Sequence, residues 1–147
     1  MTLEAALFIT NHVLAGAAIG AQLPPAKAAV AGFASHLAMD NLPHWGVVGY
    51  FPLKAAKRDG VIGLGVMAAC TALAPKGRKM RVLAGITGAC LPDTDKIGEH
   101  FVGFSPWPKR FDDFHKWIQR EAPHRIPHEV LAGAGLAVLT GLLFHRE

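Results

Sequence analysis

The sequence predicts an all-α protein, and three observations support this fold class. Ala and Gly dominate the apolar segments, and runs of Val, Ile, Thr and Tyr, which favour strands, are missing. The apolar segments are long enough to form helices, and prolines separate most of them. A chain of 147 residues can bury one core. We therefore expect a single helical domain over residues 1–147.

The first two long helices are bounded by prolines. The first is expected over residues 4–22, before Pro24 and Pro25. The second is expected over residues 27–41 and stops at Pro43, because proline disfavours helical geometry in the residue before it.

The next three long helices are bounded in the same way. The third is expected over residues 59–74 and ends at Pro75, and the fourth over residues 80–91 and ends at Pro92. The fifth is expected over residues 127–144, where a proline occupies the first helical position. We predict that these helices form a five-helix up-down bundle.

A short amphipathic helix is expected over residues 109–120, between the fourth and fifth long helices. Phe111, Phe114 and Ile118 share one stripe of it, opposite charged and polar residues. The stretch 98–120 is also rich in Phe and Trp beside Lys and Arg, which suits the boundary between lipid head groups and water. We expect this stretch to cover one end of the bundle.

The apolar helices could lie in a membrane or form the core of a soluble bundle. The composition, with 51% hydrophobic and 18% charged residues, is more apolar than that of a typical soluble domain. Residues 5–26, 61–74 and 130–144 have no charged side chain unless His12 is protonated. A complete span needs roughly 20 apolar residues, and only the first run is that long.

The charges divide unevenly between the two ends of the expected bundle. One end has six basic residues against Glu147 alone, and the other has nine basic and ten acidic residues, in agreement with the net charge of +4. The six basic residues are Lys27, Lys76, Arg78, Lys79, Arg81 and Arg146. Basic short loops are typical of the cytoplasmic side of a membrane. We therefore predict a membrane-embedded or membrane-associated protein whose other end faces away from the cytoplasm.

No aromatic residues are interleaved with these basic residues, which argues against nucleic acid as a partner.

Two pairs of polar residues close the second and fourth helices. His36 and Asp40 are four residues apart, so they project from one helix face. Asp93 and Asp95 follow Pro92 at a spacing that lets two carboxylates approach one cation. The alternatives are a His–Asp hydrogen bond at a helix end and an Asx turn.

Three further histidines reach the same end under an up-down topology. His12 lies in the first half of the first helix, and His124 and His128 lie where the fifth helix begins. A single histidine on an apolar face is more often a hydrogen-bonded core residue, but imidazoles and carboxylates that converge are typical of a metal site. His115 has no such support in the sequence, although the short helix could bring it to the site.

Four short motifs carry a resemblance to a known family. They are Asn11-His12-x-x-x-Gly16, His36-x-x-x-Asp40, Leu91-Pro92-Asp93-x-Asp95 and His124-Arg125-x-x-His128. Together they resemble the signatures of the membrane-bound metal-dependent hydrolases, a family related in pattern to the zinc-dependent phospholipases C. The motifs span residues 11–128, which is most of the chain.

The resemblance implies a divalent metal site, with zinc or manganese as the ion. The implied metal residues are His12, His36, Asp93, Asp95, His124 and His128. Asp40, a further ligand or a partner of one, or Glu129 would accept the proton of a water that the metal activates, and Arg125 would hold an anionic substrate oxygen. Hydrolysis of a phosphoester, with a lipid head group as substrate, fits this set.

Two other functions stay open at this point. The first is a non-enzymatic helical membrane protein in which the polar cluster mediates assembly or holds a structural metal. The second is a haem protein with histidines on facing helices, and the clustered aspartates argue against it. Membrane lipid is an expected partner, and self-association into a homo-oligomer is left open.

Overall fold

The computed structural model describes residues 8–47 and 49–146, and these residues form helices joined by loops, without a strand. The predicted all-α class is confirmed. The elements in chain order are α1 (Phe8–Gly20), α2 (Pro25–Asp40), α3 (Leu53–Leu73), α4 (Lys79–Cys90), α5 (Thr94–Ile97), η1 (Gly98–Val102), α6 (Lys109–Ile118), η2 (Pro123–Arg125) and α7 (Ile126–Phe144).

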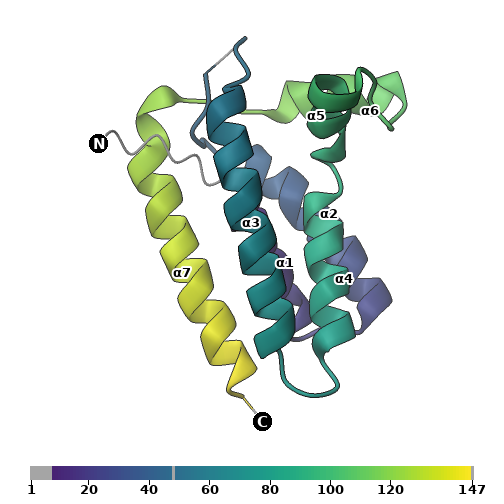
Figure 1. The fold of residues 1–147 in the computed structure, drawn as a ribbon, viewed down its shortest axis with the longest axis vertical. Coiled ribbons are helices and arrows are strands. Elements are labelled where there is room, and N and C mark those ends of the chain that lie inside the picture. The colour runs from purple at the N-terminus through teal and green to yellow at the C-terminus, as the bar shows by residue number, and fades with distance from the viewer. Residues whose placement is uncertain (1–7, 48, 147) are drawn as a thin grey trace.

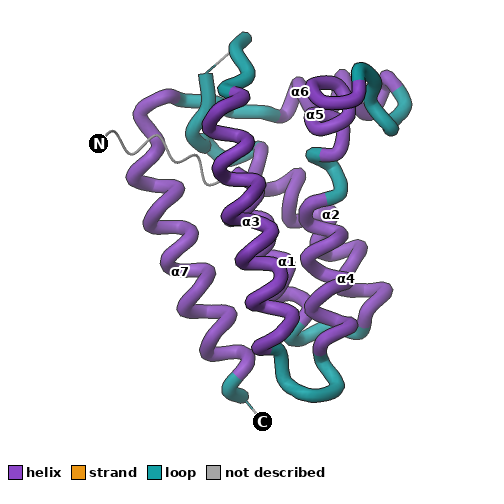
Figure 2. The backbone as a smooth tube through the Cα atoms, in the orientation of Figure 1, coloured by secondary structure: helices purple, strands orange, loops and turns teal. Residues whose placement is uncertain are grey.

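The long helices lie side by side, and the short ones lie across one end. Figure 1 shows α3, α4 and α7 along the long axis of the molecule, with α5 and α6 at the end opposite the C-terminus. Figure 2 shows that the loops gather at the two ends of the long helices. α1 is the central helix, because it packs against α2, α3, α4 and α7. Val13, Ala17, Val82 and Ile86 are fully buried in the core between these helices.

Glycines allow α4 to approach α1 and α2 closely. A Cβ atom on Gly16 would lie 2.5 Å from the carbonyl oxygen of Gly85, and a Cβ atom on Gly85 would collide with the carbonyl oxygen of Gly16. A Cβ atom on Gly32 would collide with the same oxygen of Gly85, and one on Gly88 would collide with the carbonyl oxygen of Ala29. These helices therefore meet backbone to backbone, as small residues permit.

The helix ends follow the prolines closely, with one large difference. α2 ends at Asp40 and α4 ends at Cys90, each one residue before its predicted end. α3 begins at Leu53, six residues earlier than predicted, because Pro52 precedes it and its charged first turns are solvated. Residues 4–7 of the first predicted helix lie outside the described residues.

Within residues 8–47 and 49–146, one helical segment is long and apolar enough to cross a membrane. It covers Pro123–Phe144 and has a mean hydropathy of 1.5. Only 17% of the most apolar part of the segment is buried in the protein, and Leu131 and Val138 on α7 are 72% and 64% exposed. On α3, Val61 and Leu73 are 73% and 75% exposed. Exposed apolar side chains gathered on one helix face are typical of a surface that contacts a membrane or another protein.

The face of α6 that packs against the protein is largely polar. Asp112, His115 and Ile118 are its buried residues, whereas Phe114 is exposed. The polar residues turn inward because they have partners there. Asp112 accepts a hydrogen bond from the Ser105 hydroxyl, and His115 lies between two aspartates.

Candidate metal centre

Four buried side chains from three parts of the chain converge at the end of the bundle where α6 lies. His36 and Asp40 come from the last turns of α2, Asp93 from the turn after α4, and His115 from α6. One ligand atom from each lies within 4.8 Å of those from the other three. This group could hold a metal ion.

The Nδ1 hydrogen bonds of both imidazoles orient the rings so that each Nε2 faces Asp40 inside the group. Nδ1 of His36 lies 2.6 Å from the carbonyl oxygen of Ala89, and Nδ1 of His115 lies 2.6 Å from Oδ2 of Asp95. Both partners can only accept, so each Nδ1 carries the hydrogen. In the neutral ring the lone pair is then on Nε2, which is the arrangement that protein metal sites use.

The distances inside the group suit a tetrahedral ion. The two Nε2 atoms of His36 and His115 are 3.2 Å apart, and they lie 3.2 and 2.9 Å from Oδ2 of Asp40. Oδ1 of Asp93 lies 3.7 Å from Nε2 of His36. Two ligands bonded to zinc at about 2.0–2.1 Å in tetrahedral geometry are roughly 3.3 Å apart. Without a cation or a proton, the lone pairs and the carboxylate would repel one another.

A proton on His115 can stand in for an ion in the metal-free protein. Burial lowers the pKa of His115, but hydrogen bonds with Asp40 and Asp95 outweigh burial and raise this pKa to about 9. Burial likewise opposes ionisation of Asp93, yet Lys96 and the neighbouring imidazoles lower the pKa of Asp93 to about 2. Asp93 is thus ionised, as a metal ligand must be.

His12 lies directly against the group. Its ring stacks on that of His36 with centroids 3.9 Å apart, and its Nε2 is 3.3 Å from Oδ1 of Asp40. Nδ1 of His12 is buried and has no hydrogen-bond partner among the described residues. α1 thus adds a third imidazole beside the group.

Further contacts hold the group in place. Oδ1 of Asp95 accepts from the backbone N–H of Lys96, and Oδ2 of Asp40 accepts from the Gln119 side chain at 2.5 Å. On the outer face of α2, Phe33 packs against Trp107 and Phe111. These aromatic contacts attach α6 to α2, so His115 reaches the group on a helix that is fixed by packing.

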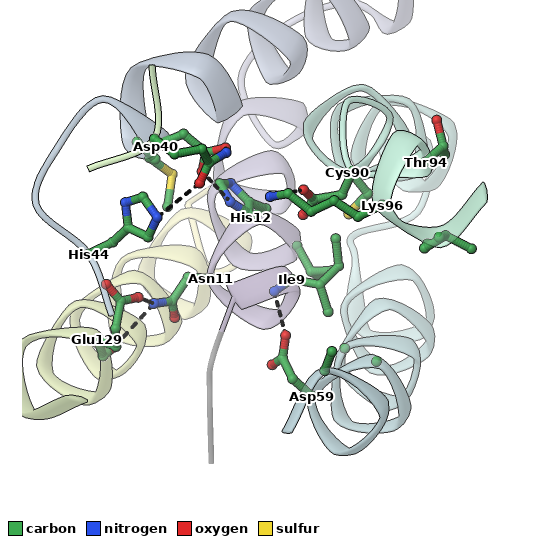
Figure 3. Close-up of a pocket in the computed structure, with 18 of the residues that line it drawn as sticks. Ile9, Asn11, His12, Asp40, His44, Asp59, Cys90, Thr94, Lys96 and Glu129 are labelled. Atoms are coloured by element: carbon green, nitrogen blue, oxygen red, sulfur yellow. Dashed lines mark hydrogen bonds and ion pairs between the residues drawn. The ribbon is translucent and has the colours of Figure 1, made fainter. Parts of the chain in front are cut away.

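A cavity of about 800 Å³ opens beside the group. His12, Asp40, Asp93 and Lys96 form its polar end. Figure 3 shows His12 between Asp40 and Lys96, whose amino group is directed toward His12. Most of the remaining wall is apolar and comes chiefly from α3 and from the loop between α2 and α3. The fully buried His36 and His115 lie behind the carboxylates, so an ion here would have its accessible side on the cavity, as catalytic metal sites require.

The other predicted residues lie outside the four-residue group. His128 and Glu129 line the cavity from α7, and Glu129 accepts a hydrogen bond of 2.7 Å from the Asn11 side chain. His124 and Arg125 lie in η2 and do not line the cavity; His124 is exposed, and Nε of Arg125 is buried without a partner among the described residues. The short η2 turn therefore does not bring both histidines of the motif to one point.

His115 belongs to the candidate metal group, although the sequence alone left it unassigned. The available signal was the spacing of Asp112, His115 and Ile118, which places them on one helix face. In the sequence that face is mostly polar, so nothing near it indicates that it packs against the protein. Only the positions of Asp40 and Asp95 show why the polar face turns inward.

Comparisons of the chain with protein-family models, with curated proteins and with solved structures find no match. Conclusions about the site therefore depend on its own geometry.

Proposed function

We propose that the protein is a metal-dependent hydrolase that acts on a phosphoester at a membrane surface. One observation carries the proposal. Two carboxylates at the polar end of a largely apolar cavity converge with two imidazole Nε2 atoms that lie behind them. Mixed nitrogen and oxygen ligands favour zinc and also suit manganese.

A bound divalent ion supplies a Lewis acid and lowers the pKa of a water coordinated to it. The protein side chains divide the remaining work. His36, Asp40, Asp93 and His115 hold the ion, and Asp95 and the Ala89 carbonyl orient the two imidazoles.

His12 is the side chain that we assign to proton transfer. It lines the cavity, and its Nε2 faces Asp40, so the hydrogen of the neutral ring is on Nε2 and the lone pair is on Nδ1. Nδ1 is buried and has no partner among the described residues, so it would accept the proton of a water that reaches it from the cavity. Glu129, also on the cavity wall, is bonded to Asn11. Asp40, the other residue predicted from the sequence to be the base, belongs to the metal group.

We further propose that the long helices form an up-down bundle in the bilayer, with the metal centre facing away from the cytoplasm. The exposed apolar faces of α3 and α7 support membrane contact. The basic loop between α3 and α4 lies at the same end of the molecule as the C-terminus (Figure 1). There Arg78 donates a hydrogen bond to the Leu143 carbonyl. Basic loops of this kind favour the cytoplasmic side.

The deciding experiment is metal analysis followed by an activity assay. Detergent-purified protein stripped of metal is incubated with zinc or manganese, desalted and analysed for bound metal, and then assayed with a chromogenic phosphoester. We expect bound metal and metal-dependent hydrolysis in the unchanged protein. In His36→Ala and His115→Ala we expect no hydrolysis and a zinc affinity so much lower that little metal stays bound through desalting. His145→Ala is the matched control, since His145 is exposed and lies after the end of α7.

The outcomes separate the hydrolase from the alternatives. Bound metal without hydrolysis of any phosphoester would leave a structural metal and contradict the proposed activity. Absence of bound zinc and manganese from the folded protein would contradict the metal centre itself.

A further inference from the structure

Lys96 places a positive charge inside the metal centre. Its Nζ lies 2.9 Å from Oδ1 of Asp93, the oxygen that faces His36. The lysine projects from α5, which begins immediately after Asp93, so the two residues are three apart on one helical turn. Figure 3 shows the amino group of Lys96 on the cavity wall, directed toward His12.

The charge around the centre matches one divalent ion. Three carboxylates lie there, on Asp40, Asp93 and Asp95, and Lys96 supplies one positive charge. With neutral histidines the sum is therefore −2, which a single dication neutralises. A second dication would leave an excess of +2 in a buried site.

Three of the carboxylate oxygens beside the group already accept hydrogen bonds. Both oxygens of Asp95 accept hydrogen bonds, one from His115 and one from the backbone of Lys96. Oδ1 of Asp93 accepts from the Lys96 amino group. The ammonium thus supplies a positive charge at Oδ1 of Asp93, which disfavours a second cation beside that oxygen.

We propose that the centre holds one divalent ion and that Lys96 binds an anionic oxygen of the phosphoester beside it. This inference rests on the proposed function and adds the anion-binding residue. An ammonium has three N–H groups, and Asp93 accepts one of them. The remaining donors adjoin the cavity, where the apolar wall strengthens a charge-assisted hydrogen bond. The substrate class is accordingly an anionic phosphoester and not a neutral carboxylic ester.

Lys57 provides a matched control on the same cavity wall. Its side chain is exposed, and its amino group lies 5.6 Å from the centre of the Phe101 ring. Lys57→Gln removes the same charge as Lys96→Gln without changing a contact of Asp93.

The test measures bound zinc and the binding of inorganic phosphate to zinc-loaded, desalted protein by calorimetry. We expect one zinc ion per chain and measurable phosphate binding. Lys96→Gln should keep the zinc and weaken phosphate binding about 10- to 100-fold, the range of a hydrogen bond to a charged group. Lys96→Arg should retain phosphate binding because the charge remains, and Lys57→Gln should change it less than about threefold.

Several results would overturn the inference while leaving the hydrolase intact. Two zinc ions per chain or no phosphate binding by the zinc-loaded protein would contradict it, and so would unchanged phosphate affinity in Lys96→Gln. Loss of zinc from folded Lys96→Gln would also contradict it, because the lysine would then be a structural partner of Asp93. If the unchanged protein binds no metal, the proposed function fails first, and the role of Lys96 fails with it. Circular dichroism and thermal unfolding of each variant establish that the fold is kept.

Discussion

Asp95→Asn is expected to weaken zinc binding, although Asp95 is outside the four-residue metal group. Both of its oxygens accept hydrogen bonds, from Nδ1 of His115 at 2.6 Å and from the backbone N–H of Lys96 at 2.5 Å. Asparagine offers one oxygen and one NH₂ group. In either orientation the NH₂ group therefore faces a donor, in a place where Asp95 is only 1% exposed.

The size of the effect follows from that mismatch. If the NH₂ group faces His115, the imidazole must move its hydrogen to Nε2, the atom that binds the ion. If it faces Lys96, a buried N–H group loses its acceptor, which costs about 1–3 kcal/mol. Loss of a group that orients a metal-bound histidine typically lowers metal affinity about 10- to 100-fold, so we expect a decrease of that size.

The assay is competition for zinc against a chromophoric chelator at constant pH in detergent. Asp113→Asn is the control on the same helix, because Asp113 pairs with Lys109 on the surface of α6. Since Asp95 acts through His115, Asp95→Asn should have little further effect in a His115→Ala background. Affinity within about twofold of the unchanged protein in folded Asp95→Asn, or an equal decrease in both backgrounds, would refute this reasoning.

Three further predictions test the packing, the protonation and the membrane contact. Gly85→Leu should lower thermal stability by about 3 kcal/mol or more, because its side chain would collide with the backbone of α1, whereas Gly135→Ala, with open space around it, should not; equal melting temperatures would contradict the packing. Protonated His115 stabilises the metal-free protein fully below its unfolded pKa of about 6.5, and this stability is lost as pH rises through its folded pKa of about 9. Melting temperatures of the metal-free protein should therefore fall between pH 7 and pH 9.5, and His115→Ala should lack that decrease. Replacement of the exposed Phe114 and Trp117 by serine should weaken binding to lipid vesicles without changing bound zinc, and unchanged flotation with vesicles would count against an interfacial role for α6.

The sequence was sufficient to predict the helical fold and part of the candidate metal centre, because both depend on residues that are close together in the chain. Prolines end α2 and α4 within one residue of the predicted positions, and this places Asp40 and Asp93 at the end of the bundle. The spacing of His36 and Asp40 requires only a regular helix. The structure brings both pairs together beside α6.

The remaining residues depend on contacts that are distant in the sequence. His115 joins the group through aspartates 75 and 20 residues away, and nothing in the sequence near α6 indicates which of its faces is buried. The motif with His124 and His128 has the spacing of a ligand pair, but the η2 turn and the helix after it direct the two histidines differently. Lys96 acquires its role only when α5 turns it toward the cavity.

The two imidazoles of the metal group differ in what orients them. His36 is held by the main-chain carbonyl of Ala89, which no side-chain substitution at that position removes. His115 is held by the side chain of Asp95, which can be replaced without changing the packing of the long helices. One half of the centre is therefore robust to mutation, and the other half is adjustable. Selection or engineering could tune the strength of metal binding through α5 and α6 while the rest of the molecule stays as it is.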